Sequence, residues 1–161
     1  MPDQARDRPR RPGESAADRE WLARAVELSR DCPPSQSAYS VGAVIVDADG
    51  REIAAGHSRE TDPRDHAEEV ALARAAGDPR LRGATIYSSL EPCGSRASRP
   101  RSCAQLIIEA GIPRVVYAWH EPSIFVEATG AAKLRAGGRT VLQLPDLAET
   151  VRQINAHLLP D

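Results

Sequence analysis

Residues 41–55 read VGAVIVDADGREIAA, and this stretch decides the fold of the first half of the chain. Its first six residues are apolar or small and rich in valine and isoleucine, which favours a buried β-strand. The DADG at 47–50 is a turn signal, and the mostly apolar residues 52–55 follow it. The sequence therefore predicts a β-hairpin made of strands 41–46 and 52–55.

Segments with helical and strand-like patterns alternate on both sides of this hairpin. Before it, apolar residues between 21 and 28 recur at helical spacing, which predicts a helix from about residue 16 that ends before Pro33 and Pro34. After it, we expect helices at 66–76, 103–110, 128–136 and 146–159, and strands at 84–88, 114–118 and 140–144. Such alternation predicts an α/β fold with helices packed on a mostly parallel sheet.

The domain organisation is simple in this reading. Residues 1–15 combine three prolines with many charges and no apolar periodicity, so we expect a flexible tail. Residues 16–161 then form a single domain, which is a normal length for one hydrophobic core. No apolar run approaches the roughly 20 residues of a membrane span and the N-terminus is polar, so we expect a cytoplasmic protein without membrane contact.

Charge and composition narrow the classes of function. The formal net charge is -2 and aromatic residues make up 4% of the chain. A groove for RNA or DNA strands needs basic and aromatic side chains, so we do not expect nucleic acid as a partner. The chain has three cysteines, and without an export signal this number favours thiolate chemistry over disulfides. Cys32 is read as the spare thiol.

His66, Cys93 and Cys103 form the set with the clearest chemistry. Zinc takes neutral imidazole and thiolate ligands, and a catalytic zinc site uses three protein ligands so that water fills the fourth position. Nucleobase deaminases carry H-x-E followed by P-C-x-x-C, in which the glutamate moves protons and is not a ligand. HAE at 66–68 matches the first half, whereas nine residues separate the two cysteines here. We therefore predict a Zn²⁺ site with Glu68 as the proton shuttle.

His66 and Glu68 are two residues apart, and such residues do not face each other within a helix. We therefore expect them at the start of the helix at 66–76, with Cys103 at the start of the next one. Both helices follow strands, which places the site at the carboxyl ends of the strands.

Several segments resemble the cytidine-deaminase-like superfamily, and more narrowly its riboflavin-pathway pyrimidine deaminases. These are VGAVIV at 41–46, HAE at 66–68, LEPC at 90–93 and GIPRVV at 111–116. The resemblance covers residues 21–144, and AYSVG at 38–42 is closest to the fungal deaminase domain. It implies a three-layer α/β/α sandwich on a mixed five-stranded sheet, a homodimer, and an aminopyrimidine substrate with a phosphorylated ribityl or ribosyl amine. Bacterial members have an asparagine before the V-G strand, and this chain has Ala38-Tyr39-Ser40 there.

Four further residues are candidates for substrate contacts. The insertion at 94–102 carries three arginines, of which Arg96 is the candidate for a phosphate group, although solvated charges explain such a cluster equally well. Glu91 either accepts a hydrogen bond from the substrate amino group or braces the loop. His57 and His120 follow predicted strands and either line the pocket or are hydrogen-bonded structural histidines.

The leading hypothesis is a zinc-dependent hydrolase that deaminates a small aminopyrimidine. The enzymatic alternative is a cytosine, cytidine or deoxycytidylate deaminase, and the long segment between the cysteines favours the first. The alternative without catalysis is a structural zinc module, against which Glu68 argues because such a site has no use for a proton carrier.

Overall fold

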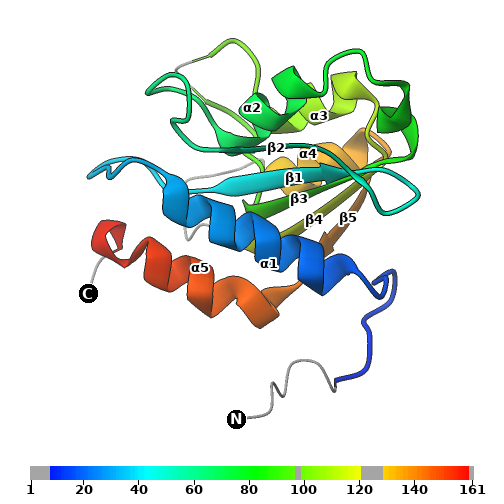
Figure 1. Ribbon diagram of the computed structural model, residues 1–161, viewed down its shortest axis with the longest axis horizontal. Helices are drawn as coiled ribbons and strands as arrows, with labels where there is room; N and C mark the ends of the chain where they lie inside the picture. The colour runs from blue at the N-terminus through cyan, green and yellow to red at the C-terminus, as the bar shows by residue number, and fades with distance from the viewer. Residues whose placement is uncertain (1–7, 97–98, 121–128, 160–161) are drawn as a thin grey trace.

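Five strands form one mixed sheet in the computed structural model, which describes residues 8–96, 99–120 and 129–159 (Figure 1). The strands are β1 (Gly42–Val46), β2 (Glu52–His57), β3 (Thr85–Leu90), β4 (Arg114–Trp119) and β5 (Thr140–Gln143), in the spatial order β2-β1-β3-β4-β5. β1 runs antiparallel to both of its neighbours, whereas β3, β4 and β5 are parallel. The expectation of a mostly parallel sheet is therefore wrong for β1, and the mixed five-stranded sheet is confirmed.

The hairpin explains the mixed direction. The side chain of Asp47 accepts hydrogen bonds from the amides of Asp49 and Arg51, each at 2.9 Å, and Gly50 adopts a φ of 81° that favours glycine. This turn makes β2 antiparallel to β1. The crossover through α2 (Ala67–Arg74) then returns the chain in the direction of β2 but places β3 on the other side of β1.

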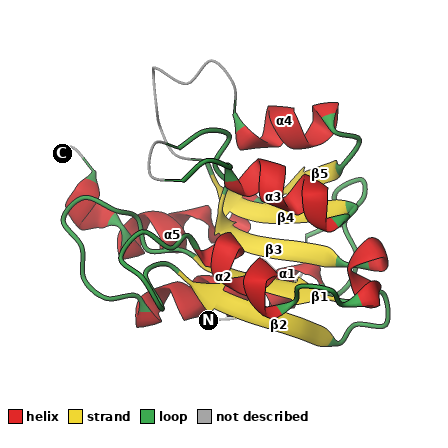
Figure 2. Cartoon of the chain, turned by 90° about the horizontal axis from the view of Figure 1, so that it is seen from above, coloured by secondary structure: helices red, strands yellow, loops and turns green. Residues whose placement is uncertain are grey.

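Helices cover both faces of the sheet (Figure 2). α1 (Asp18–Leu28) and α5 (Ala148–Ile154) lie on one face, and α2, α3 (Cys103–Ala110) and α4 (Gly130–Ala136) lie on the other. Four short 3-10 turns complete the described chain: Ser29–Asp31, Pro79–Gly83, Pro145–Leu147 and Ala156–Leu158. The three-layer α/β/α sandwich implied by the resemblance is confirmed.

Each face of the sheet has its own hydrophobic core, because neighbouring residues of a strand point to opposite faces. Ala43 and Ile45 of β1 pack with α2, α3 and α4, whereas Val44 and Val46 pack with α1 and α5. All five residues of β1 are buried, which accounts for its continuous apolar sequence.

The expected helix at 146–159 is interrupted. α5 ends at Ile154, and the buried Asn155 hydrogen-bonds through its side chain to the backbone amide of Ser40 at 2.7 Å and to the carbonyl of Val151 at 3.0 Å. An asparagine side chain that bonds to the backbone competes with helix continuation. These contacts also fix the segment that leads into β1.

Part of the expected flexible tail is held against the domain. Arg8 and Arg11 form ion pairs with Asp146, and the Glu14 side chain, which pairs with Arg8, is 2% exposed. Asp146, far along the chain, thus contacts two arginines of residues 8–15, and composition alone does not reveal this contact. Residues 1–7 of the expected tail and residue 128 of the expected helix lie outside the described residues.

Asp18 at the start of α1 connects this helix to the sheet. Its buried carboxylate accepts hydrogen bonds from the Arg114 guanidinium at 2.8 Å, from the Tyr87 hydroxyl at 2.7 Å and from the Ser15 hydroxyl at 2.8 Å. These bonds hold the pKa of Asp18 at about 2 even though burial opposes its ionisation.

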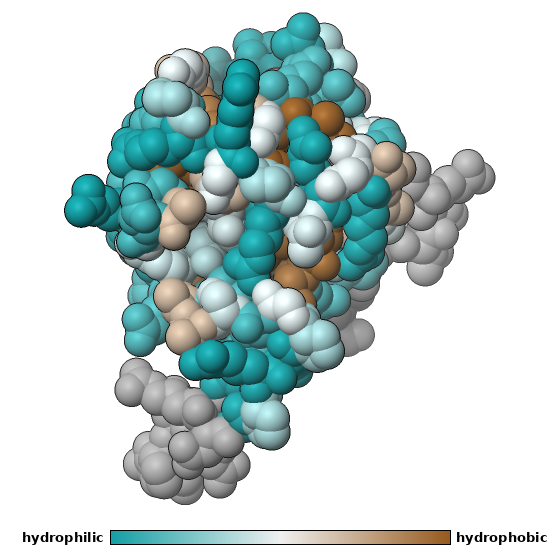
Figure 3. Space-filling model, turned by 90° about the vertical axis from the view of Figure 1, so that its right-hand side faces the viewer, coloured by the Kyte–Doolittle hydropathy of each residue, from teal (hydrophilic) through white to brown (hydrophobic). Residues whose placement is uncertain are grey.

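The end of the molecule that carries the β1–β2 turn is mostly hydrophilic, with hydrophobic residues only in small separate groups (Figure 3). Within the described ranges, the helices are too short or too polar to cross a bilayer.

Candidate metal and active site

His66 and Glu68 lie at the first turn of α2, as the sequence predicts. His66 is the N-cap residue, and the Glu69 carboxylate accepts a hydrogen bond from its backbone amide at 3.3 Å. Glu68 follows within the first turn and is 3% exposed. Residues at a helix start can point past its end, so the imidazole and the carboxylate reach the same space.

Cys93 and Cys103 come together where the loop after β3 meets the start of α3. The Cys93 thiol accepts a hydrogen bond from the Cys103 amide at 3.1 Å, and the Cys93 carbonyl accepts one from the Ala104 amide at 3.0 Å. Unpaired amides at a helix N-terminus favour negative charge. The bond with the Cys103 thiol is the main cause that lowers the pKa of Cys93, and burial opposes it.

The three side chains suit a zinc ion. The Cys103 Sγ lies 3.3 Å from His66 Nδ1, and one ligand atom from each of His66, Cys93 and Cys103 lies within 4.8 Å of the others. In the part of the chain that the structure describes, no other group of three such side chains comes this close. Cys32 lies apart, with its thiol 3.5 Å from the Val41 carbonyl. One imidazole and two thiols leave a fourth position for solvent, which is typical of a catalytic zinc site.

Burial raises the pKa of Glu68, and a hydrogen bond with the Ser88 hydroxyl opposes this rise. Ser88 lies on β3 and is fully buried, and its hydroxyl is also 2.7 Å from the Leu90 carbonyl. The hydroxyl has one proton. It can therefore donate to a Glu68 carboxylate, or donate to the Leu90 carbonyl and accept from a protonated Glu68.

Sequence reasoning missed Ser88. The only available signal is a polar residue at a strand position expected to be buried. Its partner, Glu68, is 20 residues away, and the sequence does not show which strand passes behind α2.

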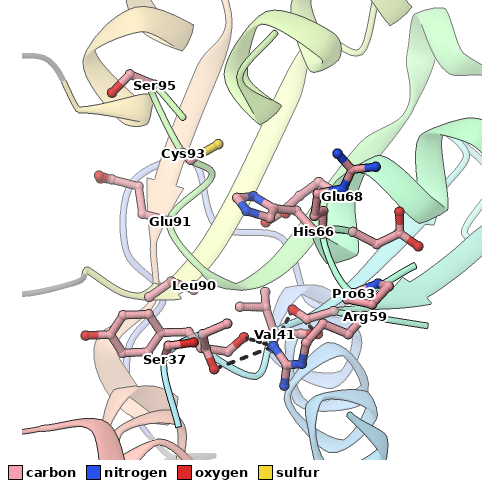
Figure 4. Close-up of a pocket in the computed structure, with 15 residues that line it drawn as sticks. Ser37, Val41, Arg59, Pro63, His66, Glu68, Leu90, Glu91, Cys93 and Ser95 are labelled. Carbon is pink, nitrogen blue, oxygen red and sulfur yellow. Dashed lines mark hydrogen bonds between the residues drawn. The ribbon is translucent and has the colours of Figure 1, made fainter. Parts of the chain in front are cut away.

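The metal-site residues open into a cavity of about 480 Å³ (Figure 4). Besides His66, Glu68 and Cys93, it is lined by Ser37, Ala38, Tyr39, Val41, Ser58, Arg59, Pro63, Arg64, Asp65, Leu90, Glu91 and Ser95. Tyr39 packs edge-on against Trp119, with ring centroids 6.0 Å apart. In Figure 4, the Cys93 thiol and the His66 ring point toward each other across the cavity.

Two of the four predicted contact residues form a pair beside the cavity. Glu91 lines it, and its side chain is 8% exposed. His120 Nδ1 lies 3.1 Å from both carboxylate oxygens of Glu91 while the ring is 49% exposed. His120 is thus placed to orient Glu91 and is not among the lining residues.

Arg96 and His57 also lie outside the lining of the cavity. The Arg96 side chain is 4% exposed and donates to the Glu69 carboxylate at 3.3 Å and to the Arg64 carbonyl at 2.7 Å. His57 Nε2 lies 3.5 Å from Glu60, and its Nδ1 is 3.1 Å from the Ser58 carbonyl. The contacts of His57 fit the alternative of a hydrogen-bonded structural histidine. Acceptors of the fold hold the Arg96 side chain, and its contact with the substrate stays a prediction. Residues 97–98 of the insertion lie outside the described residues.

A sequence model of the family described as the cytidine and deoxycytidylate deaminase zinc-binding region matches residues 15–119. A diaminohydroxyphosphoribosylamino-pyrimidine deaminase of Schizosaccharomyces pombe is 38% identical over 127 residues, which is 77% of this chain and 31% of that protein. The chain thus spans about a third of the length of this curated relative.

Two solved structures are also similar. A diaminohydroxyphosphoribosylaminopyrimidine deaminase/5-amino-6-(5-phosphoribosylamino)uracil reductase of Thermotoga maritima is 35% identical, with a TM-score of 0.72 over 84% of this chain and 38% of that one. The Aspergillus oryzae Rib2 deaminase in complex with DARIPP has a TM-score of 0.75 over 86% of this chain and 90% of that one. At 23% identity, the second likeness shows the fold alone.

Proposed function

The chain belongs to the cytidine and deoxycytidylate deaminase zinc-binding family, and from that premise we propose that it is a zinc-dependent hydrolase that deaminates a small aminopyrimidine. One observation carries this proposal. His66, Cys93 and Cys103 are within reach of one ion, and the buried carboxylate of Glu68 lies in the same cavity.

The proposed substrate is the compound for which the fission yeast relative is named, a diaminohydroxypyrimidine with a phosphorylated ribosyl amine, or its ribityl counterpart. The 38% identity over 77% of the chain supports this choice. Because the chain covers only 31% of that relative, the proposal is limited to deamination. In this reaction the oxygen of water replaces a ring amino group, and ammonia leaves.

His66, Cys93 and Cys103 would hold the zinc ion through one nitrogen and two sulfur atoms. A zinc ion held there would supply a nucleophile at neutral pH, because it would lower the pKa of water toward about 7. Glu68 accepts one proton from that water and delivers it to a ring nitrogen, and it then accepts the second proton from the hydroxyl now on the ring carbon and delivers it to the leaving amine. Both water protons thus end on nitrogen, and the carboxylate is regenerated.

Ser88 keeps Glu68 hydrogen-bonded in both of its states. When Glu68 is ionised, the hydroxyl donates to it, and when Glu68 is protonated, the hydroxyl accepts from it and donates to the Leu90 carbonyl. The carboxyl group therefore does not need to find a new partner during the proton transfers.

Glu91 and the aromatic pair would position the substrate ring. The Glu91 carboxylate accepts a hydrogen bond from a ring amino group, while His120 fixes the orientation of Glu91. Tyr39, held by its edge-on contact with Trp119, forms an apolar wall of the cavity and excludes water.

Deamination of cytosine, cytidine or deoxycytidylate is the second candidate, because the description of the matching family names cytidine and deoxycytidylate. A structural zinc module remains the alternative without catalysis, and the buried Glu68 argues against it.

The test is ammonia release from a panel of aminopyrimidines and cytosine compounds, with zinc content measured in parallel. Glu68→Gln should keep zinc and fold but lose about 10²- to 10⁴-fold in kcat, which is the usual contribution of a positioned acid-base group. Glu109→Gln is the matched control, since this side chain is 41% exposed on α3 and pairs with Arg101 outside the cavity. A Glu68→Gln protein with undiminished turnover would refute the assignment of Glu68.

We further propose that the protein acts in the cytoplasm as a homodimer. The three cysteines are free thiols, which suits a reducing compartment, and the dimer is supported by the resemblance to the deaminase family. Light scattering of the purified protein tests the dimer, and a monomeric mass at micromolar concentration would contradict it.

A further inference from the structure

Two arginines, Arg59 and Arg64, line the cavity in addition to the acidic residues near the metal site. We propose that Arg64 binds the phosphate group of the substrate and that the charge of Arg59 attracts this group to the same side of the cavity. This inference rests on the proposed function, because it assigns a binding site to one part of the proposed substrate.

The Arg59 guanidinium has only neutral partners. It donates to the carbonyl oxygens of Tyr39 at 2.9 Å and Pro33 at 2.7 Å, to the Ser40 hydroxyl at 3.2 Å, and more distantly to the Ala38 carbonyl at 3.5 Å. No carboxylate of the described residues forms an ion pair with it. A cation that is partly removed from water without a counter-charge favours an anion nearby.

Arg59 therefore has two effects. Its hydrogen bonds hold residues 33–40, which supply the cavity wall at 37–39 (Figure 4). These bonds occupy both terminal nitrogens of the guanidinium without neutralising its charge, and its buried Nε–H has no acceptor among the described residues. Because both terminal nitrogens of Arg59 are occupied by the fold, we assign the direct contact with phosphate to another residue.

Arg64 can provide that contact because its backbone is fixed and its side chain is exposed. Its amide donates to the Asp62 carboxylate at 2.8 Å, and its carbonyl accepts from Arg96 at 2.7 Å. The Arg64 guanidinium is 61% exposed, and it meets Asp62 only at 3.5 Å. Such an exposed contact is weak, so a phosphate dianion can compete for the guanidinium fork.

Acidic and basic side chains both line the cavity. In Figure 4, Glu91 and Cys93 lie on one side, and Arg59 and Pro63, the neighbour of Arg64, lie on the other, where Glu68 is labelled as well. The Asp65 carboxylate near the arginines is occupied by the amides of 61 and 62 and by Arg99. A substrate with a ring amino group at Glu91 and its phosphate at Arg64 would contact both sides at once.

This assignment replaces the phosphate role that the sequence suggested for Arg96. The Arg96 side chain is 4% exposed and bonds to Glu69 and to the Arg64 carbonyl, so it fixes the backbone position of Arg64.

The experiment compares Arg64→Ala with the original protein on the proposed substrate and on the same compound without phosphate. We expect KM for the phosphorylated compound to rise about 10- to 100-fold with kcat little changed, which is the loss expected for a hydrogen bond between charged groups. KM for the dephosphorylated compound should stay within about twofold. Arg101→Ala is the control, because Arg101 is also 61% exposed and lies outside the cavity lining.

Equal losses on both compounds, an unchanged KM, or a phosphate-selective loss in Arg96→Ala alone would overturn the inference. If the original protein releases ammonia from neither compound, the proposed function fails, and the site is then tested by thermal shift. Ribose 5-phosphate should stabilise the original protein more than ribose does, and this difference should disappear in Arg64→Ala. Inorganic phosphate is tested separately. Stabilisation by inorganic phosphate but not by ribose 5-phosphate would contradict a site for a phosphorylated sugar.

Discussion

Asp18→Asn should strongly destabilise the fold, because Asp18 is a fully buried carboxylate at the junction of α1, β3 and β4. An asparagine keeps the size of the side chain but removes its charge. The guanidinium of Arg114, which donates two hydrogen bonds to Asp18, would then remain partly buried without a counter-charge. Breaking a buried pair from one side costs about 3–5 kcal/mol.

The lowered pKa of Asp18 gives a second figure for the contribution of its ionised form to the folding free energy. Its fall from the ordinary value of 3.8 to about 2 corresponds to about 2 kcal/mol of folding free energy. The Arg114 side chain is 21% exposed, so solvent screens part of the interaction and this figure is an upper value. Because the folded pKa is lowered, this contribution is present above about pH 4 and is lost as the pH falls toward 2.

Urea denaturation of both proteins between pH 2 and pH 6 provides the assay. We expect the difference in unfolding free energy to be largest above pH 4.5 and to shrink by up to about 2 kcal/mol toward pH 2, where Asp18 in the original protein becomes protonated. Tyr87→Phe, which removes one hydrogen bond to Asp18, should cost about 1 kcal/mol and keeps the test informative if Asp18→Asn fails to fold.

Glu27→Gln is the control for Asp18→Asn, since Glu27 is 66% exposed on α1 and its loss should change stability by less than about 0.5 kcal/mol. A difference between Asp18→Asn and the original protein that stays constant from pH 6 to pH 2 would refute the reasoning.

Two further predictions concern the surroundings of the site. Ser88→Ala should lower kcat about tenfold with KM unchanged, because the hydroxyl orients Glu68 and does not contact the substrate. Ser88→Thr keeps a hydroxyl and should restore most of the lost kcat. Steady-state kinetics of both variants checks this prediction, and an equal loss of kcat in both would point to packing. Gly130→Ala should weaken zinc retention and lower the melting temperature, since a Cβ at this position would lie 1.6 Å from the Pro92 carbonyl oxygen beside Cys93. Zinc content after dialysis and a thermal melt check this prediction. Wild-type values of both would show that α4 can move away.

The sequence predicted that His66, Cys93 and Cys103 come together because H-x-E followed by P-C is a signature of zinc deaminases, and helix periodicity indicated where His66 and Cys103 lie. Histidine two residues before glutamate excludes a mid-helix position, and the structure indeed has His66 at the N-cap of α2. Cys103 likewise begins α3. These placements follow from helix periodicity and from segments that are contiguous in the chain.

What the sequence could not predict are contacts between distant segments. β3 lies beside β1 and not beside β2, and alternation of helices and strands does not determine this choice. Asn155 ends α5 through a bond to Ser40, 115 residues away. Similarly, the roles of Arg64 and Arg96 depend on which carboxylates and carbonyls the fold brings near them, and an arginine-rich sequence does not distinguish the two.

Zinc-edge X-ray absorption on the purified protein shows whether His66, Cys93 and Cys103 hold a single zinc ion. We predict one zinc per chain with two sulfur atoms at about 2.3 Å and two nitrogen or oxygen atoms at about 2.0–2.1 Å, one of them from solvent. Protein without stoichiometric zinc, or a zinc shell with no sulfur or with four sulfur atoms, would contradict the account.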